Sequence, residues 1–347
     1  MLSNLNPKAR ARELARHDER FAEAVAPGGY SWWYFDALSD DGRRAFTAIF
    51  FIGSVFSPDY AKRLRRGEQA PAQDHLAVNL ALYEGGRPVS WVMSEYGAGA
   101  LTCADDDLAI GASHVERLPG GGLRLHIHDR TAPFMASLVG VGGGVDGTIE
   151  IEPSAPPIGG AELAISGGHK HRWRVPVPRA RVKVRFRRPD FSFEGWGYHD
   201  ANCGDGRLES TFSRWSWARF HPERDRTVIL YSVRGRDGAA RAMVVDAKDG
   251  AAQPDREARA VGPAPDGAPR SAGWGMTLPA SFAVGDGRLR CQPDRLIDVA
   301  PFYVRYVGAL TDGPKVLATG MGEYLDLDRF RSPALQFLLR FKTRRVG

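Results

Sequence analysis

The sequence predicts an all-β protein with two antiparallel β domains of barrel or sandwich type, one short helix near its start and another at its end. Short runs rich in Val, Ile, Phe and Trp recur along the 347 residues, with turn signals about every 8–12 positions, as in sandwiches and barrels. The 40 Gly and 23 Pro are enough to supply those turns. A chain of this length suits two domains of ordinary size.

The start of the chain predicts a helix, a β-hairpin and a basic segment. Residues 8–25 have the polar, periodic character of a helix, and the following Pro-Gly-Gly at 27–29 is a stop signal. The aromatic runs on either side of Asp40-Asp41-Gly42 predict a hairpin, because turn residues separate two strand-like segments. Residues 57–74 are basic and are expected to form a loop or a short helix.

Further strands follow, separated by turns and two longer breaks. Residues 153–160, rich in Pro and small residues, predict a linker, and 249–273 predict a mobile surface loop. Residues 331–347 form a basic amphipathic tail with a short helix. The expected strands lie at 75–84, 88–97, 107–117, 122–130, 145–152, 172–187, 191–199, 207–220, 226–235, 240–247, 274–284, 286–292, 302–312 and 315–325.

These breaks predict four parts of the chain. They are a helical extension at 1–27, a first β domain at 28–155, a second β domain at 161–330, and the basic tail at 331–347.

Composition excludes several classes of protein. The net charge of +6 and the sequence pI near 9.3 favour anionic surfaces, either nucleic acid or acidic lipid. Three cysteines without CxxC spacing argue against a disulfide framework and a structural zinc site. The start lacks the apolar segment of a secretory signal, and the sequence contains no apolar run of about 18 residues that could span a bilayer.

Two basic or histidine-rich patterns each allow two interpretations. Alternating aromatic and basic residues at 172–189 fit a nucleic-acid groove or the solvated face of a strand, and the second is favoured because any half-buried strand alternates in this way. The pairs His126/His128 and His169/His171 each lie on one face of a strand and could begin a metal site. A third ligand is not evident, so no metal is predicted.

The segment 193–220 concentrates residues suited to acid chemistry. Trp196, Tyr198 and Asp200 share one strand face, as do His171 and Trp173 on the strand before it. Neighbouring strands could thus place Asp200 in an apolar pocket, where poor solvation would keep it protonated. The competing interpretation is an aromatic core in which Asp200 only caps the Gly-Asp-Gly turn, and a calcium loop is a remote third.

Three segments strongly resemble the carotenoid 1,2-hydratases of purple phototrophic bacteria: 28–60 (GGYSWWYFDALSDDGRRAFTAIFFIGSVFSPDY), 74–84 (DHLAVNLALYE) and 197–219 (GYHDANCGDGRLESTFSRWSWAR). The resemblance runs from about residue 28 to about residue 325. The WWYFDA opening and the third segment are shared with a wider superfamily of lipocalin-like proteins and pericyclases. The first two segments are more specific to the hydratases.

This resemblance implies two lipocalin-like (calycin-type) domains, no cofactor, and addition of water to the terminal 1,2 double bond of acyclic carotenes such as neurosporene or lycopene. By position, Asp200 matches the family's proposed proton donor, with His171, Trp173 and Tyr198 as companions. Cys203 departs from relatives that often carry another residue there. The aromatic residues expected to contact substrate are Trp196, Trp215, Trp217, Trp33 and Tyr34.

A carotene is nearly insoluble in water, so contact with an anionic membrane is expected and nucleic acid is not an expected partner. Basic and apolar residues in two segments suit the headgroup level: Lys62, Arg63, Arg65, Arg66, Leu338, Leu339 and Phe341. Ordinary surface helices are the alternative. The expected location is the cytoplasm, peripherally at the inner photosynthetic membrane. A polyene cyclase or pericyclase, or a lipocalin-like carrier of apolar ligands, remains an alternative function.

Overall fold

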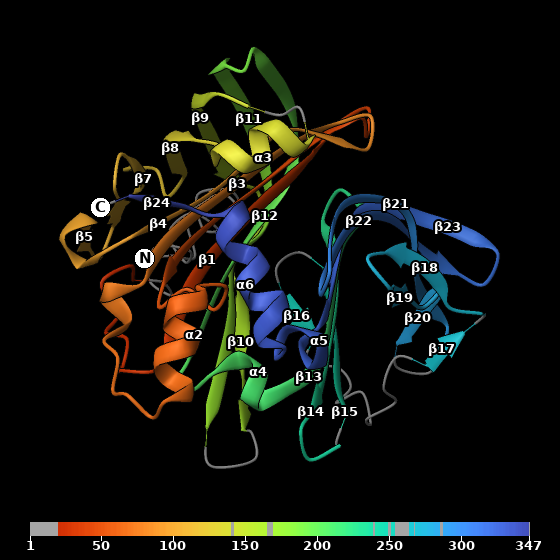
Figure 1. Ribbon diagram of the computed structural model, residues 1–347. Coiled ribbons are helices and arrows are strands. Elements are labelled where there is room, and N and C mark those ends of the chain that lie inside the picture. Colours follow the sequence, from red (N-terminus) through yellow and green to blue (C-terminus); the bar gives the residue numbers. More distant parts are fainter. Residues whose placement is uncertain are drawn as a thin grey trace. The chain divides into compact units, whose positions relative to one another are not determined.

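The computed structural model describes residues 20–139, 142–164, 169–238, 240–248, 251–253, 264–266, 268–284 and 287–346. Strands dominate these residues and helices are short, which confirms the predicted all-β class (Figure 1). The chain divides into two compact units, one built from residues 1–164, 169–207 and 336–347 and the other from 165–168 and 208–335. Each unit contains one large curled sheet.

The sheet of the first unit is antiparallel except where the C-terminal strand joins it. Its strand order is β24-β4-β3-β2-β1-β12-β11-β9-β8-β7-β6-β5, and β10 also pairs with β11. The bounds are β1 Tyr30–Ser39, β2 Arg44–Ile52, β3 Leu76–Glu84, β4 Arg87–Tyr96, β5 Leu101–Ala104, β6 Asp107–Ile110, β7 Ser113–Arg117, β8 Leu123–Arg130, β9 Gly144–Pro153, β10 Ile158–Ala164, β11 Lys170–Arg188, β12 Phe191–Gly204 and β24 Arg344–Val346.

Short helices connect these strands. They are α2 Pro58–Arg65, η2 Ala72–Asp74, η3 Ala98–Ala100, α3 Pro133–Val139 and, near the C-terminus, α6 Pro333–Lys342. Helix α2 confirms the short-helix option for the basic segment, and its N-cap Ser57 accepts a hydrogen bond from the amide of Tyr60. The predicted hairpin is β1–β2, whose turn includes Gly42 at φ 68°, a conformation that favours glycine.

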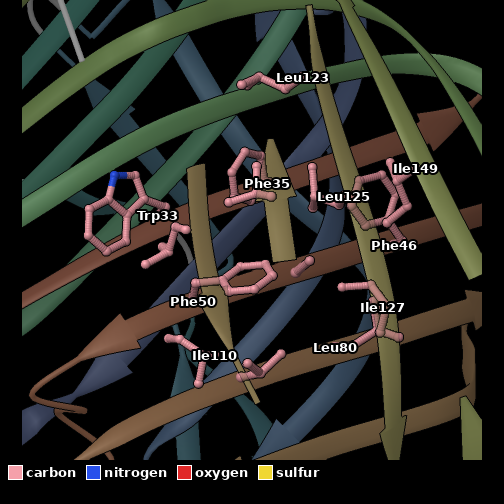
Figure 2. Packing of buried hydrophobic residues seen from close by; sticks show 14 of the residues in the cluster. Trp33, Phe35, Phe46, Phe50, Leu80, Ile110, Leu123, Leu125, Ile127 and Ile149 are labelled. Atoms are coloured by element: carbon pink, nitrogen blue, oxygen red, sulfur yellow. The ribbon is translucent and has the colours of Figure 1, made fainter. Parts of the chain in front are cut away.

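One face of the first sheet forms the main core. Trp33 and Phe35 of β1 and Phe50 of β2 pack with Leu125 and Ile149 of the strands that curl over them (Figure 2). Each such side chain contributes roughly 1.5–3 kcal/mol when fully buried. Because side chains alternate along a strand, the residues between these point to the opposite face of the same sheet.

The division into units differs from the expected boundary at 155–161. The hairpin β11–β12 pairs with β9 on one side and β1 on the other, so it supplies central strands of the first sheet. Residues 158–160 of the expected linker begin β10, for which β11 is the one strand partner within the described residues. Prolines that lie just before an edge strand do not interrupt the hydrogen-bond ladder of a sheet. The segment can therefore have the composition of a linker although a strand begins within it.

The second unit has its own sheet, in the order β16-β15-β14-β13-β23-β22-β21-β20-β17, and a two-stranded sheet β18-β19. Phe220, Leu230 and Tyr306 lie in its core. The bounds are α4 Leu208–Thr211, β13 Phe212–Glu223, β14 Arg226–Gly235, β15 Ala240–Lys248, β16 Ala251–Gln253, β17 Ala264–Asp266, β18 Arg270–Gly273, β19 Met276–Leu278, β20 Ser281–Val284, β21 Leu289–Ala300, β22 Tyr303–Asp312, β23 Lys315–Asp326 and α5 Leu327–Phe330.

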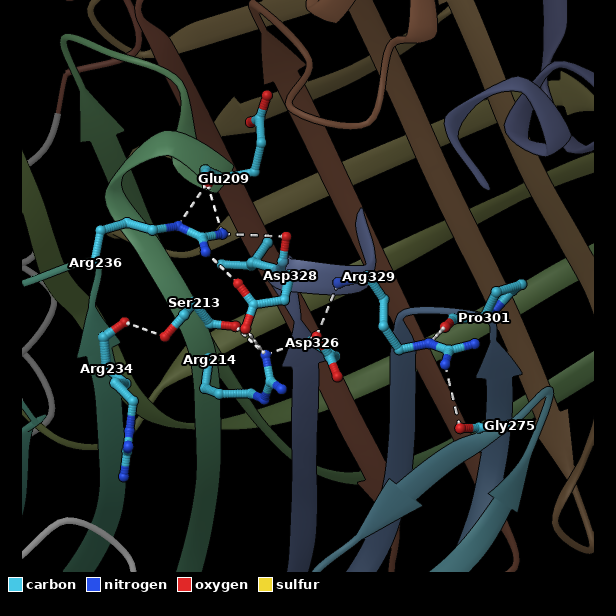
Figure 3. A network of polar contacts seen from close by, with 11 residues as sticks. Glu209, Ser213, Arg214, Arg234, Arg236, Gly275, Pro301, Asp326, Asp328 and Arg329 are labelled. Atoms are coloured by element: carbon cyan, nitrogen blue, oxygen red, sulfur yellow. Dashed lines mark hydrogen bonds and ion pairs between the residues drawn. The ribbon is translucent and has the colours of Figure 1, made fainter. Parts of the chain in front are cut away.

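A polar network fixes the end of this second sheet (Figure 3). The Arg214 guanidinium donates to the carboxylates of Asp326 and Asp328, at 2.7 Å each. Arg236 also contacts Asp328 and donates to the carbonyl oxygen of Glu209. The network ties β13, α4 and the residue that follows β14 to the short helix α5.

Three further expectations concern the ends and the long loop. Most of the predicted helix 8–25 lies outside the described residues, and Arg20–Val25 form a turn and extended chain. Much of 249–273 also lies outside them, although β16, β17 and β18 fall within it. The predicted C-terminal helix is confirmed as α6. The strand β24 that follows it was not predicted.

Candidate active site

The face of the first sheet opposite the core carries a row of aromatic and polar side chains. Strands β1 and β12 pair so that Tyr34 lies opposite Asp200, and Asp36 lies opposite Tyr198. On the other side of β12, Trp173 of β11 lies opposite Asn202. We call this surface the polar face and define it by Tyr30, Trp32, Tyr34, Asp36, His171, Trp173, Tyr198, Asp200 and Asn202.

Asp200 lies at the centre of the polar face and is 4% exposed. Its Oδ2 accepts hydrogen bonds from Trp173 Nε1 and from the Tyr198 hydroxyl, both at 2.9 Å. Its Oδ1 accepts a hydrogen bond from Asn202 Nδ2, also at 2.9 Å. The structure therefore brings together three of the four residues expected to do the chemistry.

The turn after β12 is held by a different carboxylate. Asp205 Oδ1 accepts a hydrogen bond from the backbone amide of Lys170 at 2.8 Å, whereas Asp200 lies inside the strand. The capping role that sequence allowed for Asp200 thus belongs to Asp205. Within the described residues, no three His, Cys, Asp or Glu side chains gather as metal ligands.

His171, the fourth expected residue, is fully buried. Its Nδ1 is 2.9 Å from the Tyr30 hydroxyl. Burial lowers the pKa of His171 to about 3, although the nearby Asn202 side chain acts in the opposite direction. The imidazole is therefore neutral at pH 7. Asn202 joins the two halves of the site, since it donates to Asp200 and lies beside His171.

Gly204 explains how Tyr30 reaches His171. The two residues flank Gly204 on β1 and β11, in one row across the sheet. A Cβ atom at Gly204 would lie 2.4 Å from Cζ of Tyr30, so any larger residue would displace the phenol. The glycine is required here for close approach rather than for an unusual backbone angle.

The expected substrate-contacting residues are distributed over four environments. Tyr34 is on the polar face, where its hydroxyl donates to Asp36 Oδ2 at 2.9 Å. Trp33 points into the core on the opposite face and packs edge-on against Phe21. The half-buried Trp196 ring has the guanidinium of Arg179 stacked 3.4 Å from its centroid.

The remaining two, Trp215 and Trp217, belong to β13 of the second unit. Both are buried, and Trp215 packs edge-on against Phe212 and Tyr231.

Sequence reasoning missed several members of the polar face. Asp36 is completely buried, and Trp32 stacks on Tyr30 with ring centroids 5.1 Å apart. Asn202 was not among the residues predicted for the site. Counting by two from Tyr34 along its strand would have placed Tyr30, Trp32 and Asp36 on the same face.

The two histidine pairs are used for other contacts. His126 stacks on His114 with centroids 4.3 Å apart and lies 3.5 Å from Glu116. His128 lies 3.9 Å from Asp146, and His169 lies 3.3 Å from Asp205.

The residues expected to meet a membrane divide into two groups. Arg63 pairs with Glu68, Arg65 donates to Gln336, and Leu339 is buried. The second group consists of four exposed residues, Lys62, Arg66, Leu338 and Phe341, and Arg65 is exposed as well. No helix within the described ranges is both long enough and apolar enough to cross a bilayer.

Comparisons with known proteins point to one family. A family model for the carotenoid hydratase CrtC matches residues 48–347. The acyclic carotenoid 1,2-hydratase of Thiocapsa roseopersicina is 34% identical over 329 residues, which cover 94% of this chain and 76% of that protein. The acyclic carotenoid 1,2-hydratase of Cereibacter sphaeroides is 32% identical over 303 residues, covering 86% of this chain and 98% of that protein.

Solved structures of similar shape support the fold alone. A Nitrosomonas europaea protein assigned as AttH superposes with a TM-score of 0.57 at 16% identity, covering 89% of this chain and 93% of that chain. CghA bound to Sch210972 superposes with a TM-score of 0.50 at 14% identity, covering 86% and 89%. Both are lipocalin-like, as the sequence resemblance implied.

Proposed function

The chain belongs to the carotenoid hydratase family, and from that premise we propose that it adds water across the terminal 1,2 double bond of an acyclic carotene such as neurosporene or lycopene. It would act as a hydro-lyase and produce a tertiary alcohol. The names of its relatives, acyclic carotenoid 1,2-hydratases, support the substrate class.

The buried carboxyl group of Asp200 is the observation that carries this proposal. An unactivated alkene accepts a proton only from a strong acid, and that acid must be protonated when the substrate arrives. Keeping an Asp with an ordinary pKa near 3.9 protonated at pH 7 takes about 4 kcal/mol. The 4% exposure of Asp200 supports such a role, because burial disfavours the charged form.

The two hydrogen-bond donors at Oδ2 also favour proton transfer, because they stabilise the carboxylate that the transfer forms. As the proton leaves Oδ1 for C2 of the carotene, negative charge develops on the carboxyl group. Trp173 and Tyr198 already point at Oδ2, so they stabilise that charge without rearranging. A hydrogen bond to a charged group contributes about 1.5–3 kcal/mol. Burial would thus keep the acid neutral at rest, and the two donors would strengthen it during proton transfer.

The tertiary cation at C1 needs an electron-rich wall. Trp173 donates its N–H to Asp200, so its ring lies next to the acid and is the proposed partner of the cation, with Tyr198. A desolvated cation–π contact contributes about 2 kcal/mol. Trp196 is a poorer candidate because the Arg179 guanidinium already stacks on its ring.

Water then attacks C1 and forms the C–O bond. The protonated alcohol loses a proton, which returns to the Asp200 carboxylate and restores the acid, so the reaction needs no other co-reactant than water. Neutral His171 would help to orient the water, because a group with a pKa of about 3 does not hold a proton at pH 7.

Incubation with lycopene followed by mass analysis tests the function. A gain of one water supports hydration, an isomer of unchanged mass would indicate a cyclase or pericyclase, and unchanged bound pigment would indicate a carrier. Asp200→Asn should fold normally and yield no hydroxylated product. Asp205→Asn, the same change at the turn carboxylate, is the matched control and should remain active. Near-normal turnover by Asp200→Asn would eliminate the proposed acid.

We also propose that the first unit meets an anionic bilayer through α2 and α6. Three aromatic side chains form an exposed cluster. The ring centroid of Phe341 lies 5.2 Å from that of Phe134 and 5.5 Å from that of Phe337. Lys62 of α2 and its C-cap residue Arg66 are exposed, and the contacts Arg65–Gln336 and Arg340–Asp59 join α2 to α6. Exposed aromatic residues beside cations suit the headgroup level.

Vesicle flotation tests the membrane proposal. The protein should float with anionic vesicles and less with neutral ones, and the double variant Phe337→Ser, Phe341→Ser should lose binding. Val316, which is 61% exposed in the second unit, provides the control, because Val316→Ser removes an apolar group elsewhere. Equal binding by all three proteins would reject this surface.

A further inference from the structure

The two oxygens of the Asp200 carboxyl group have unequal surroundings. Oδ2 accepts two hydrogen bonds, from Trp173 and Tyr198, whereas Oδ1 has its contact with Asn202. An indole N–H can only donate, so the side of Oδ2 that faces Trp173 must remain an acceptor in every protonation state. The proton of the neutral acid is therefore best placed on Oδ1, facing Asn202.

Asn202 as it stands suits only the ionised acid. Its Nδ2 donates to Asp200 Oδ1, which is favourable for a carboxylate and unfavourable for an O–H group. Its own Oδ1 is buried, and the side-chain hydrogen bond between Asn202 and His171 acts to raise the histidine pKa, as expected when the imidazole donates to that oxygen.

A half-turn of the Asn202 amide exchanges its nitrogen and oxygen in nearly the same space. The amide oxygen would then accept the Asp200 proton, and the nitrogen would point toward His171. His171 can match either orientation, because its Nδ1 contacts a Tyr30 hydroxyl that can both donate and accept. One tautomer donates to the amide oxygen, and the other accepts from the amide nitrogen.

We propose that Asn202 is a positioning residue whose amide turns with the protonation state of Asp200, so that both the neutral acid and its carboxylate keep a hydrogen-bond partner. Through this amide, the Tyr30–His171 pair holds the acid in place without exchanging protons with it. The inference rests on the proposed role of Asp200 as the acid, and it assigns His171 an action through Asn202.

Infrared spectroscopy of the free protein tests this without any turnover. The carbonyl band of protonated Asp200 is the band that disappears in Asp200→Asn. In Asn202→Leu, which keeps the shape of the side chain and removes its polar atoms, that band should shift, because the acid proton loses its acceptor. Asn79→Leu is the matched control: Asn79 is another buried asparagine, whose Nδ2 donates to the Val92 carbonyl on the same sheet. It should leave the band unchanged.

Kinetics provide the second readout. Asn202→Leu should lower kcat about 10- to 100-fold while leaving KM within about twofold, as expected when an interaction with the charged form is lost. An unshifted band, or an unchanged kcat, in Asn202→Leu would overturn the assignment of Asn202 while Asp200→Asn stays inactive. Absence of any protonated Asp200 band at pH 7 in the unaltered protein would instead overturn the proposed acid itself.

Discussion

The indole of Trp173 donates a hydrogen bond to Oδ2 of Asp200 at 2.9 Å, between adjacent strands β11 and β12. Trp173 lies opposite Asn202 in the strand register, so its ring reaches diagonally across the sheet to the carboxyl group. The donor is fixed by packing, because Trp173 is 1% exposed. Trp173 thus has two proposed roles: its N–H donates to the developing carboxylate, and its aromatic ring stabilises the cation.

Substitution at Trp173 separates these roles. Trp173→Phe keeps an aromatic face and loses the donor, so kcat should fall about tenfold or more, in line with one lost hydrogen bond to a charged group. Trp173→Ala loses both and should fall further. Steady-state kinetics with lycopene, accompanied by thermal melts, measure this, and equal activity of the two variants would contradict a role for the ring face.

The adjacent residues Trp32 and Trp33 should behave differently because they point to opposite faces of β1. Trp33→Ala empties the core and should reduce the free energy of unfolding by about 3–5 kcal/mol. Trp32 is partly exposed and stacks on Tyr30. Compared with Trp33→Ala, Trp32→Leu should therefore lower the free energy of unfolding less and lower the turnover more. Denaturant melts and lycopene turnover on both variants check the contrast, which a reversed order would refute.

His171 should make stability depend on pH. Its pKa is about 3 in the folded protein against 6.5 in the unfolded chain, so between these values the unfolded chain binds a proton that the folded protein does not. Lowering the pH from 7 to 5 should therefore cost about 2 kcal/mol through this residue. Glu95 acts oppositely, because burial raises its pKa to about 7 and acid relieves that penalty.

The variant His171→Gln isolates the histidine contribution, since Glu95 is common to both proteins. Relative to the unaltered protein, the variant should become more stable by about 2 kcal/mol on going from pH 7 to pH 5. Urea melts at the two values measure this difference. The exposed His128→Gln is the control, and an identical pH profile for His171→Gln would reject the buried neutral imidazole.

Arg344 should anchor the C-terminal strand. It contacts buried Asp129, which also accepts hydrogen bonds from Ser94 at 2.7 Å and Tyr96 at 3.1 Å. Arg344→Met would leave that carboxylate without its cation and should cost about 2–3 kcal/mol, less than for a fully buried pair because the arginine side chain is 27% exposed. Arg345→Met, at an exposed pair with Asp59, should cost under about 1 kcal/mol.

Urea melts distinguish the two arginines. Similar losses in both variants would show that the C-terminal strand is held by its backbone pairing with β4 rather than by Arg344.

Local pattern was sufficient to predict much of this protein. The alternation of apolar residues, the turn at Gly42 and the terminal helix α6 follow from residues close in sequence, and each was read from the sequence correctly. The shared face of Tyr198 and Asp200 follows from the two-residue period of a strand. The family itself was identified from three continuous segments.

Only the tertiary structure decided which sheet each strand joins and what lies on its two faces. The β11–β12 hairpin belongs to the first unit because β1 and β9 pair with it, and β1 is far from it in sequence. Cross-strand register places Asp36 and Asn202 in the site. Trp33 lies in the core because it is one residue away from Tyr34 on β1 and therefore faces the opposite side of the sheet. Register is set by pairing between distant segments, and a one-residue step exchanges the faces, so composition near a residue could not determine its neighbours.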